Sequence, residues 1–156
     1  KLNIFGTYGH EMYETREAIR EYDFVNTSMR YDTGHGVSKP LGFEDYYRWC
    51  RNFDSMIAAG SLEERYQYTF AKYFEIPAAG ALLFAQYCQD LERLGFDDSN
   101  SVIFNSLNEF EQKAEAYLDH PEKYLSRRQN GVKLVRNRHT VEDRIETLDD
   151  HLDTPK

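Results

Sequence analysis

Apolar and polar residues follow one another along this chain with two alternating periods. Short apolar runs typical of buried strands lie at Leu2–Phe5, Phe24–Met29, Phe53–Ala58, Ala81–Ala85 and Val102–Phe104. Between these runs, apolar side chains recur every three or four residues, as on one face of a helix. Strands that alternate with helices predict an α/β fold: a Rossmann-like parallel sheet of about five strands, covered by helices on both faces and followed by C-terminal helices.

Glycines and capping residues mark the ends of these elements. The first strand runs into the turn Gly6-Thr7-Tyr8-Gly9, and Gly80 ends a helix that begins at Tyr68. Ser106 and Glu109 have the spacing of a capping box. Residues 32–42 contain three glycines and a proline, which predicts a loop. Thr140 is expected to begin the last helix, with His139 beside its cap.

The predicted sheet indicates where a ligand would bind. In parallel sheets with helices on both faces, ligands lie beyond the carboxyl ends of the strands, near the point where the strand order reverses. We therefore expect a site bordered by residues 6–10, 32–39, 60–72 and 86–90.

Composition and charge exclude several classes of function. The 156 residues include 27 acidic and 19 basic side chains, which gives a net charge of −8 and argues against nucleic-acid binding. No apolar run approaches the ~18 residues of a membrane span. We expect no signal peptide, because the first residues do not show the pattern of one. Cys50 and Cys88 have no zinc-type spacing and are interpreted as reduced thiols. We expect a cytoplasmic protein with a single domain, residues 1–156.

The segment Lys72–Gly80 carries the clearest chemical signal. A helix that begins over the strand ends presents free N–H groups and its positive dipole end, both of which attract phosphate. Lys72 and Glu75 are three residues apart and share a helix face. A cation beside a carboxylate suits a nucleoside diphosphate, with lysine near phosphate and glutamate accepting from ribose hydroxyls. The alternative interpretation is a surface ion pair.

This segment also resembles a known enzyme family. Lys72-Tyr-Phe-Glu75-Ile-Pro-Ala-Ala-Gly80 is similar to the K-x-F-E-x-x-A-x-G segment of GT-B glycosyltransferases of the group 1 type, in particular the branch with a CgeB-like, spore-maturation-like domain. The resemblance covers residues 43–152 well and residues 2–42 loosely. Further similar segments follow in the family's order: Leu94–Asp98, Val102–Phe104, Glu109–Pro121, Arg127–Gly131 and Arg138–Arg144.

The resemblance implies the C-terminal half of a GT-B fold, which holds a nucleotide-sugar donor. Glu75 would then bind the ribose of the donor. Many members have a second glutamate eight residues upstream that helps to hold the sugar, and this chain has Gln67 there, which can form hydrogen bonds but carries no charge. The Gly6–Gly9 turn would bring backbone close to the donor phosphates. The remaining candidates for the donor site are Lys72, Arg65, Tyr66 and Thr69.

The motifs do not identify a catalytic group. His10 follows the glycine turn and could contact acceptor or donor, or it could be a solvated residue at a helix start. His10-Glu11-x-x-Glu14 lacks the second histidine of a zinc protease motif, and no D-x-D motif occurs. His35 is a candidate ligand in the predicted loop. We expect no cofactor and no metal, because helix ends and cations would stabilise the leaving diphosphate.

Two classes of function stay open. The first is donor binding for sugar transfer from a nucleoside diphosphate to a hydroxyl acceptor. In this interpretation an N-terminal acceptor-binding domain or a partner chain completes the site, and the isolated chain turns over little or nothing. The second is a non-catalytic module on the same fold that binds a nucleotide, a sugar or a protein. A dinucleotide-binding oxidoreductase is excluded because Gly6-x-x-Gly9 does not supply G-x-G-x-x-G.

One basic segment leaves a further alternative. Arginines and a lysine between Arg127 and Arg138 predict a solvated helix face, and the alternative is peripheral contact with a membrane surface or an acidic partner.

Overall fold

The computed structural model describes residues 1–6, 9–27 and 42–153, and a five-stranded parallel sheet lies at its centre. This confirms the predicted fold class. The strand order is β2-β1-β3-β4-β5. The strands are β1 (Leu2–Asn3), β2 (Val25–Asn26), β3 (Ser55–Ala58), β4 (Leu82–Gln86) and β5 (Val102–Phe104).

The order of the strands places a switch point between β1 and β3. β1 pairs with β2 on one side, with Leu2 opposite Val25, and with β3 on the other, with Asn3 opposite Met56. The chain therefore passes from β1 outward to β2 and then back across β1 to β3. The crevice beyond the carboxyl ends of strands at such a point is the usual ligand site of open α/β sheets.

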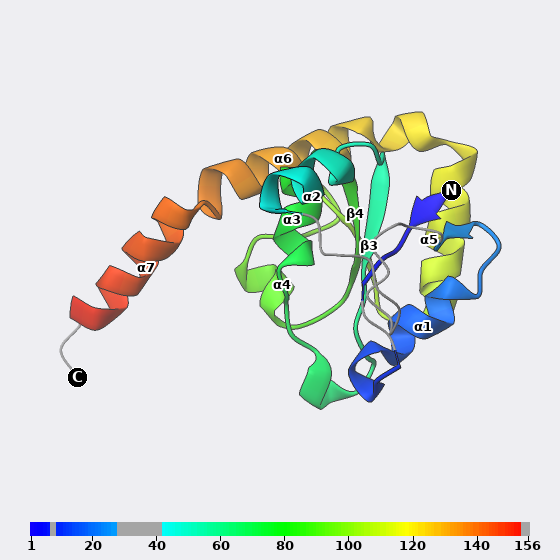
Figure 1. Ribbon diagram of the computed structural model, residues 1–156, viewed down its shortest axis with the longest axis horizontal. Helices are drawn as coiled ribbons and strands as arrows, with labels where there is room; N and C mark the ends of the chain where they lie inside the picture. Colours follow the sequence, from blue (N-terminus) through cyan, green and yellow to red (C-terminus); the bar gives the residue numbers. More distant parts are fainter. Residues whose placement is uncertain (7–8, 28–41, 154–156) are drawn as a thin grey trace.

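Helices cover both faces of the sheet (Figure 1). α1 (Glu14–Arg20) and α5 (Leu107–Asp119) pack on one face. α2 (Phe43–Cys50), α3 (Lys72–Ala78) and α6 (Leu125–Arg138) pack on the other. The shorter elements are α4 (Asp90–Arg93) and the 3-10 turns η1 (Glu11–Tyr13), η2 (Glu64–Tyr66) and η3 (Pro121–Tyr124).

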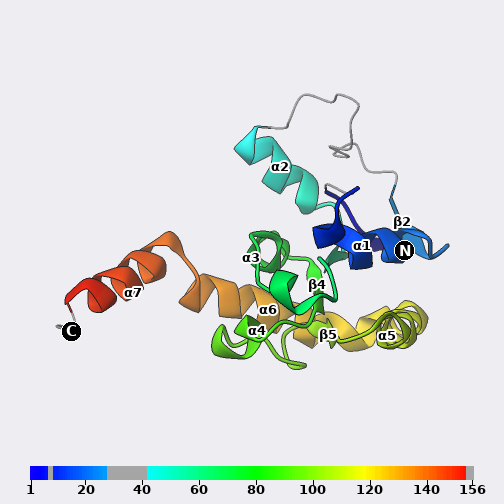
Figure 2. The ribbon, with the colours of Figure 1, turned by 90° about the horizontal axis from the view of Figure 1, so that it is seen from below.

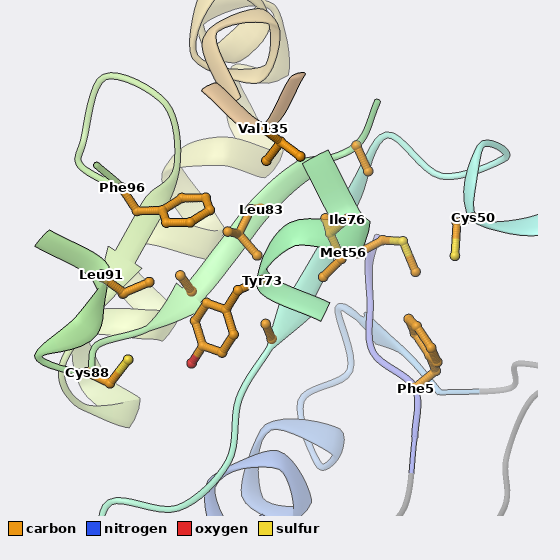
Figure 3. Packing of buried hydrophobic residues seen from close by; sticks show 13 residues of the cluster. Phe5, Cys50, Met56, Tyr73, Ile76, Leu83, Cys88, Leu91, Phe96 and Val135 are labelled. Atoms are coloured by element: carbon orange, nitrogen blue, oxygen red, sulfur yellow. The ribbon is translucent and has the colours of Figure 1, made fainter. Parts of the chain in front are cut away.

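Side chains of successive strand residues point to opposite faces, so the sheet has a core on each side. Met56 lies in the core under α2, α3 and α6, whereas its neighbour Ile57 lies in the core under α1 and α5. The first core also contains Phe5, Tyr73, Ile76, Leu83 and Val135 (Figure 3). The second contains Leu2, Ile4, Ile19, Phe84, Phe104 and Phe110.

α7 (Val141–Asp153) extends away from the sheet and its covering helices (Figures 1 and 2). Its start is a complete capping box, because the Asp143 N–H donates to Thr140 Oγ1 while Asp143 Oδ2 accepts from the Thr140 N–H. The predicted apolar stripe, Val141, Ile145, Leu148 and Leu152, is more than half exposed at every position. In the described part of the chain, no helix is both long enough and apolar enough to cross a membrane.

Several element bounds differ from the sequence prediction. α3 begins at Lys72 instead of Tyr68, and β2 is shorter than the predicted run Phe24–Met29. β1 and β2 are the shortest strands and pair through two residues each. Thr7, Tyr8 and residues 28–41, which include His35 and most of the predicted loop, lie outside the described residues.

The predicted capping box of α5 forms only in part. Ser106 accepts the Glu109 N–H at 3.2 Å, as the sequence predicts. The Glu109 carboxylate accepts instead from the N–H of Asn105, one residue before the cap, at 2.7 Å.

Candidate functional site

Two cationic side chains converge on Gly6 at the switch point of the sheet. Gly6 follows β1 with a φ of +120°, a conformation that glycine alone adopts readily. A Cβ atom at this position would lie 2.1 Å from Lys72 Nζ and 3.0 Å from Arg16 Nη1. Both cations therefore lie against the backbone of Gly6, and a larger residue there would displace them.

Lys72, the first residue of α3, lies over Phe5. Its ammonium donates to the Phe5 carbonyl oxygen and lies 4.0 Å from the centre of the Phe5 ring. Burial, and then the nearby charge of Arg16, lower the pKa of Lys72 to about 7, although the Glu75 carboxylate opposes this shift. A bound anion would favour the protonated amine, so the arrangement suits a phosphate group.

Arg16 of α1 is a further candidate residue, which the sequence prediction did not include. The side chain is buried, with 4% exposed, and its Nε donates to the Ala59 carbonyl at 3.0 Å, just beyond β3. Its guanidinium carbon lies 4.3 Å from the centre of the Tyr13 ring. The signal was present in the sequence, because Arg16 occupies a position in the stripe from Met12 to Ile19 where an apolar residue is expected.

Glu75 lies one turn after Lys72 and faces α2. The Tyr46 hydroxyl donates to Glu75 Oε2 at 2.8 Å. Burial raises the pKa of Tyr46, and so do its neighbours Cys50 and Glu75, so the hydroxyl keeps its proton. Lys72 and Glu75 each bond to another group rather than to each other. The alternative interpretation of this pair as a surface ion pair is therefore wrong.

The start of α3 offers fewer free N–H groups than the sequence predicted. The carbonyl oxygens of the preceding turn, Phe70–Ala71, lie at this end of the helix. They accept hydrogen bonds from the backbone N–H groups of Tyr73, Phe74 and Glu75. This expectation is therefore wrong for those residues, because a tight turn already satisfies the donors. The positive charge at this place comes from the two side-chain cations.

The loop after β3 carries two further candidates, Arg65 and Tyr66. Arg65 forms ion pairs with Glu63 at 2.7 Å and with Glu11 at 3.1 Å. The Tyr66 hydroxyl also donates to Glu11. These contacts join η2 to η1 at the surface, so both side chains are engaged with carboxylates in the structure.

The remaining candidates of this loop lie in different places. The Gln67 amide donates to the Leu62 carbonyl at 2.8 Å, and Gln67 borders a small pocket with Tyr66 and Gly60 at the end of β3. Thr69 borders another, open pocket of about 470 Å³ beside Phe74 of α3. The structure thus does not bring Thr69 into one pocket with Tyr66 and Gln67.

Gly9 and His10 lie at an acidic part of the surface. The Gly9 N–H donates to the Glu17 carboxylate, and His10 Nδ1 accepts the Met12 N–H at 3.2 Å, which caps η1. An open pocket of about 390 Å³ there is lined by Gly9, His10, Glu11, Glu14, Glu17 and Glu63. Because carboxylates repel phosphate, the structure favours the Gly6 end of the turn for an anion.

The sequence profile of the family described as "Glycosyl transferase-like" matches residues 3–150. The chain belongs to this family. The match extends from β1 into α7 and contains Gly6, Arg16, Lys72 and Glu75. A search of curated proteins gives no match.

In this glycosyltransferase-like chain, Gln86 fixes the beginning of the loop after β3. Its side chain is buried, with Oε1 accepting the Gly60 N–H at 2.8 Å and Nε2 donating to the Ser61 carbonyl at 2.7 Å. The Tyr73 hydroxyl donates to the Gln86 carbonyl at 2.8 Å. The loop that carries Arg65 and Tyr66 therefore starts from a point held by β4 and α3.

His139 has a structural place in this glycosyltransferase-like chain, as its position beside a helix cap predicted. Its ring is parallel to Phe96 within 6°. Arg144 can only donate, so His139 Nδ1 accepts from it at 3.1 Å and Nε2–H donates to the Leu94 carbonyl at 2.8 Å. Burial lowers the pKa of His139, which favours this neutral form. The ring joins the base of α7 to the segment after α4.

The side chains that could bind a metal ion do not gather at one place in the described part of this glycosyltransferase-like chain. Among residues 1–6, 9–27 and 42–153, no group of three or more His, Cys, Asp or Glu side chains is arranged to hold a metal ion. Cys50 and Cys88 are both buried and unpaired with each other.

Proposed function

We propose that this chain binds the nucleoside-diphosphate sugar donor for sugar transfer to a hydroxyl acceptor. Membership of the glycosyltransferase-like family supports the class of reaction. The observation that carries the donor assignment is the convergence of Arg16 and Lys72 on Gly6. Two cations held against backbone at the switch point of a parallel sheet are suited to a diphosphate.

The same two cations have a role in the chemical step. During transfer, the acceptor oxygen bonds to the anomeric carbon and gives up its proton, while the bond between the anomeric carbon and the diphosphate oxygen breaks and its electron pair stays on the diphosphate. Arg16 and Lys72 are already in place to stabilise that growing charge, without reorganisation of solvent. The proposal therefore includes donor binding without a metal, which predicts that chelators leave donor affinity unchanged.

Glu75 is assigned to the ribose of the donor. It follows Lys72 by three residues on the same short helix, so ribose and diphosphate contacts would adjoin, as they do in a nucleotide. A carboxylate oxygen is a strong acceptor for a ribose hydroxyl. His10, Gln67, Arg65, Tyr66 and Thr69 remain candidates for contacts with the sugar or the acceptor.

We further propose that the chain is the C-terminal, donor-binding half of a GT-B fold of the CgeB-like branch. An N-terminal acceptor-binding domain or a partner chain would then complete the site. The resemblance of Lys72–Gly80 to the family motif supports this assignment. A cytoplasmic location and peripheral membrane contact through α6 remain predictions from the sequence.

A non-catalytic module on the same fold is the second candidate. The observation that favours it concerns Gln67, whose amide is engaged by the Leu62 carbonyl at 2.8 Å. The side chain at which the resemblance implies a sugar contact thus forms a hydrogen bond within its own loop.

Calorimetric titration with nucleoside diphosphates and their sugars tests the proposal. We expect at least one nucleoside diphosphate to bind, and Lys72→Met and Arg16→Lys each to weaken that binding by about tenfold or more, because each alters a charge-assisted contact. Lys133→Met, at an exposed position on α6, is the matched control and should bind as the parent chain does. Absence of heat with every nucleotide would favour the non-catalytic module.

A further inference from the structure

We infer that Tyr46 is a positioning residue, which holds the Glu75 carboxylate in the orientation that receives the ribose hydroxyls of the donor. This inference rests on the proposed function. It adds a residue from α2, a helix that neither the family motif nor the sequence analysis connected with the site.

The contact between the two residues is direct. The Tyr46 hydroxyl lies 2.8 Å from Glu75 Oε2 and bridges α2 to α3. Within residues 1–6, 9–27 and 42–153, no other hydrogen bond reaches this carboxylate. Oε2 is thus oriented by the phenol, and Oε1 keeps its acceptor sites for a ligand hydroxyl.

The ring of Tyr46 is itself held in place by neighbouring aromatic rings. Its centre lies 5.9 Å from that of Phe5 and 6.2 Å from that of Trp49. Phe5 is also the residue whose ring and carbonyl hold the Lys72 ammonium. The two packed rings thus position both residues: Phe5 holds Lys72 and Tyr46 holds Glu75. Their packing sets the spacing between the diphosphate contact and the ribose contact.

The phenol is suited to this role because it can only donate to a carboxylate. A carboxylate fixed before binding loses less conformational freedom when the nucleotide arrives, so the hydroxyl contributes to ribose affinity without touching the nucleotide. Exchange of Tyr46 for phenylalanine keeps the ring and its packing, and removes the hydroxyl that donates to Glu75 and that also neighbours Cys50.

The test compares ligands that share phosphates and differ in the ribose. The probes are uridine, adenosine, guanosine and cytidine diphosphates, the 2′,3′-dideoxy analogue of each, and inorganic pyrophosphate. The proteins are the parent chain, Tyr46→Phe, Glu75→Gln and the double variant. Tyr87→Phe is the matched control, because it removes another hydroxyl that donates to a carboxylate, that of Glu92 at 3.3 Å.

We expect the parent chain to bind one ribonucleotide about tenfold or more tightly than its dideoxy analogue, since a charge-assisted hydrogen bond is lost. Glu75→Gln should remove most of this preference, and Tyr46→Phe should reduce it by about threefold or more. The double variant should match Glu75→Gln, because Tyr46 acts through Glu75. Pyrophosphate affinity should stay unchanged in Tyr46→Phe, and Tyr87→Phe should keep the full preference.

The outcomes separate the inference from the proposed function. If Glu75→Gln keeps the ribose preference, or if no diphosphate binds, the proposed donor site is wrong and the role of Tyr46 fails with it. If Glu75→Gln loses the preference and Tyr46→Phe retains it, only the role of Tyr46 is wrong. An equal loss of pyrophosphate affinity in Tyr46→Phe would show a purely structural residue and would also overturn the inference.

Discussion

The Lys72 ammonium lies 4.0 Å from the centre of the Phe5 ring and donates to the carbonyl oxygen of the same residue. The ring face attracts the cation, but burial removes the water that would otherwise stabilise the charge. The result is a lysine whose pKa falls to about 7. Its charge therefore depends on pH near neutrality, and this has consequences for both stability and binding.

The first prediction concerns stability. Above about pH 7 the folded chain releases the Lys72 proton, whereas the unfolded chain keeps it up to its ordinary pKa of 10.5. The unfolded state then binds more protons, so the contribution of Lys72 to stability rises with pH in this window. Relative to the parent chain, Lys72→Met should therefore lose stability as the pH rises from about 7 to about 9. Thermal melts measure this, and Lys133→Met should show no such trend.

The second prediction concerns affinity. An anionic nucleotide favours protonated Lys72, so binding should take up a proton above about pH 7. The affinity of the parent chain for a nucleoside diphosphate should fall as the pH rises, by up to about tenfold per pH unit. Lys72→Arg keeps its charge and should flatten this dependence. Calorimetry at a series of pH values measures the slope, and a flat profile for the parent chain would contradict the prediction.

The third prediction concerns Gly6. In Gly6→Ala the new methyl group would meet Lys72 Nζ, and the backbone would be held at an unfavourable φ of +120°. We expect a loss of about 1–3 kcal/mol of stability together with weaker nucleotide binding. Gly80→Ala is the matched control, because Gly80 has a φ of +91° but an open surrounding. Equal losses in the two variants would argue against a close approach of the cations.

The fourth prediction concerns His139. Because its pKa in the folded chain is lowered, the stability it contributes is complete above its ordinary pKa and is lost as the pH falls through the lowered value. Protonation would place a second donor against Arg144. The protection factors of the α7 amides, which correct for the slower intrinsic exchange in acid, should fall on acidification of the parent chain, and His139→Gln should weaken this dependence. His139→Ala should cost about 1–3 kcal/mol, since the ring packs on Phe96.

Local pattern was sufficient for most of the fold. The apolar run at Ala81–Ala85 predicted β4, because a strand that is covered on both faces is apolar along most of its length. The capping-box spacing of Ser106 and Glu109 predicted the start of α5, which begins at Leu107. The start of α3 was misplaced because residues 68–71 continue the apolar pattern of the helix, although residues 68–70 have no regular structure and Ala71 is a turn.

Of the candidate site, the sequence indicated the residues that stand in a recognisable local motif, including Gly6 in its glycine turn. Lys72 and Glu75 share a motif, and the pattern identified both. Arg16 and Tyr46 come from other elements, and their contacts with Gly6 and Glu75 arise from the way the chain folds back on itself. One sequence contains no direct record of such long-range contacts.

The ion pairs of Arg65 mean that the loop after β3 should respond to ionic strength. Its side chain is 58% exposed, and those of its partners, Glu11 and Glu63, are 52% and 46% exposed. Exposed pairs of this kind are screened by added salt, whereas the buried amide of Gln86 at the start of the loop is not. Salt concentration would thus loosen the tip of the loop while its base stays fixed, and it provides a reversible control over access to the strand ends without any change of sequence.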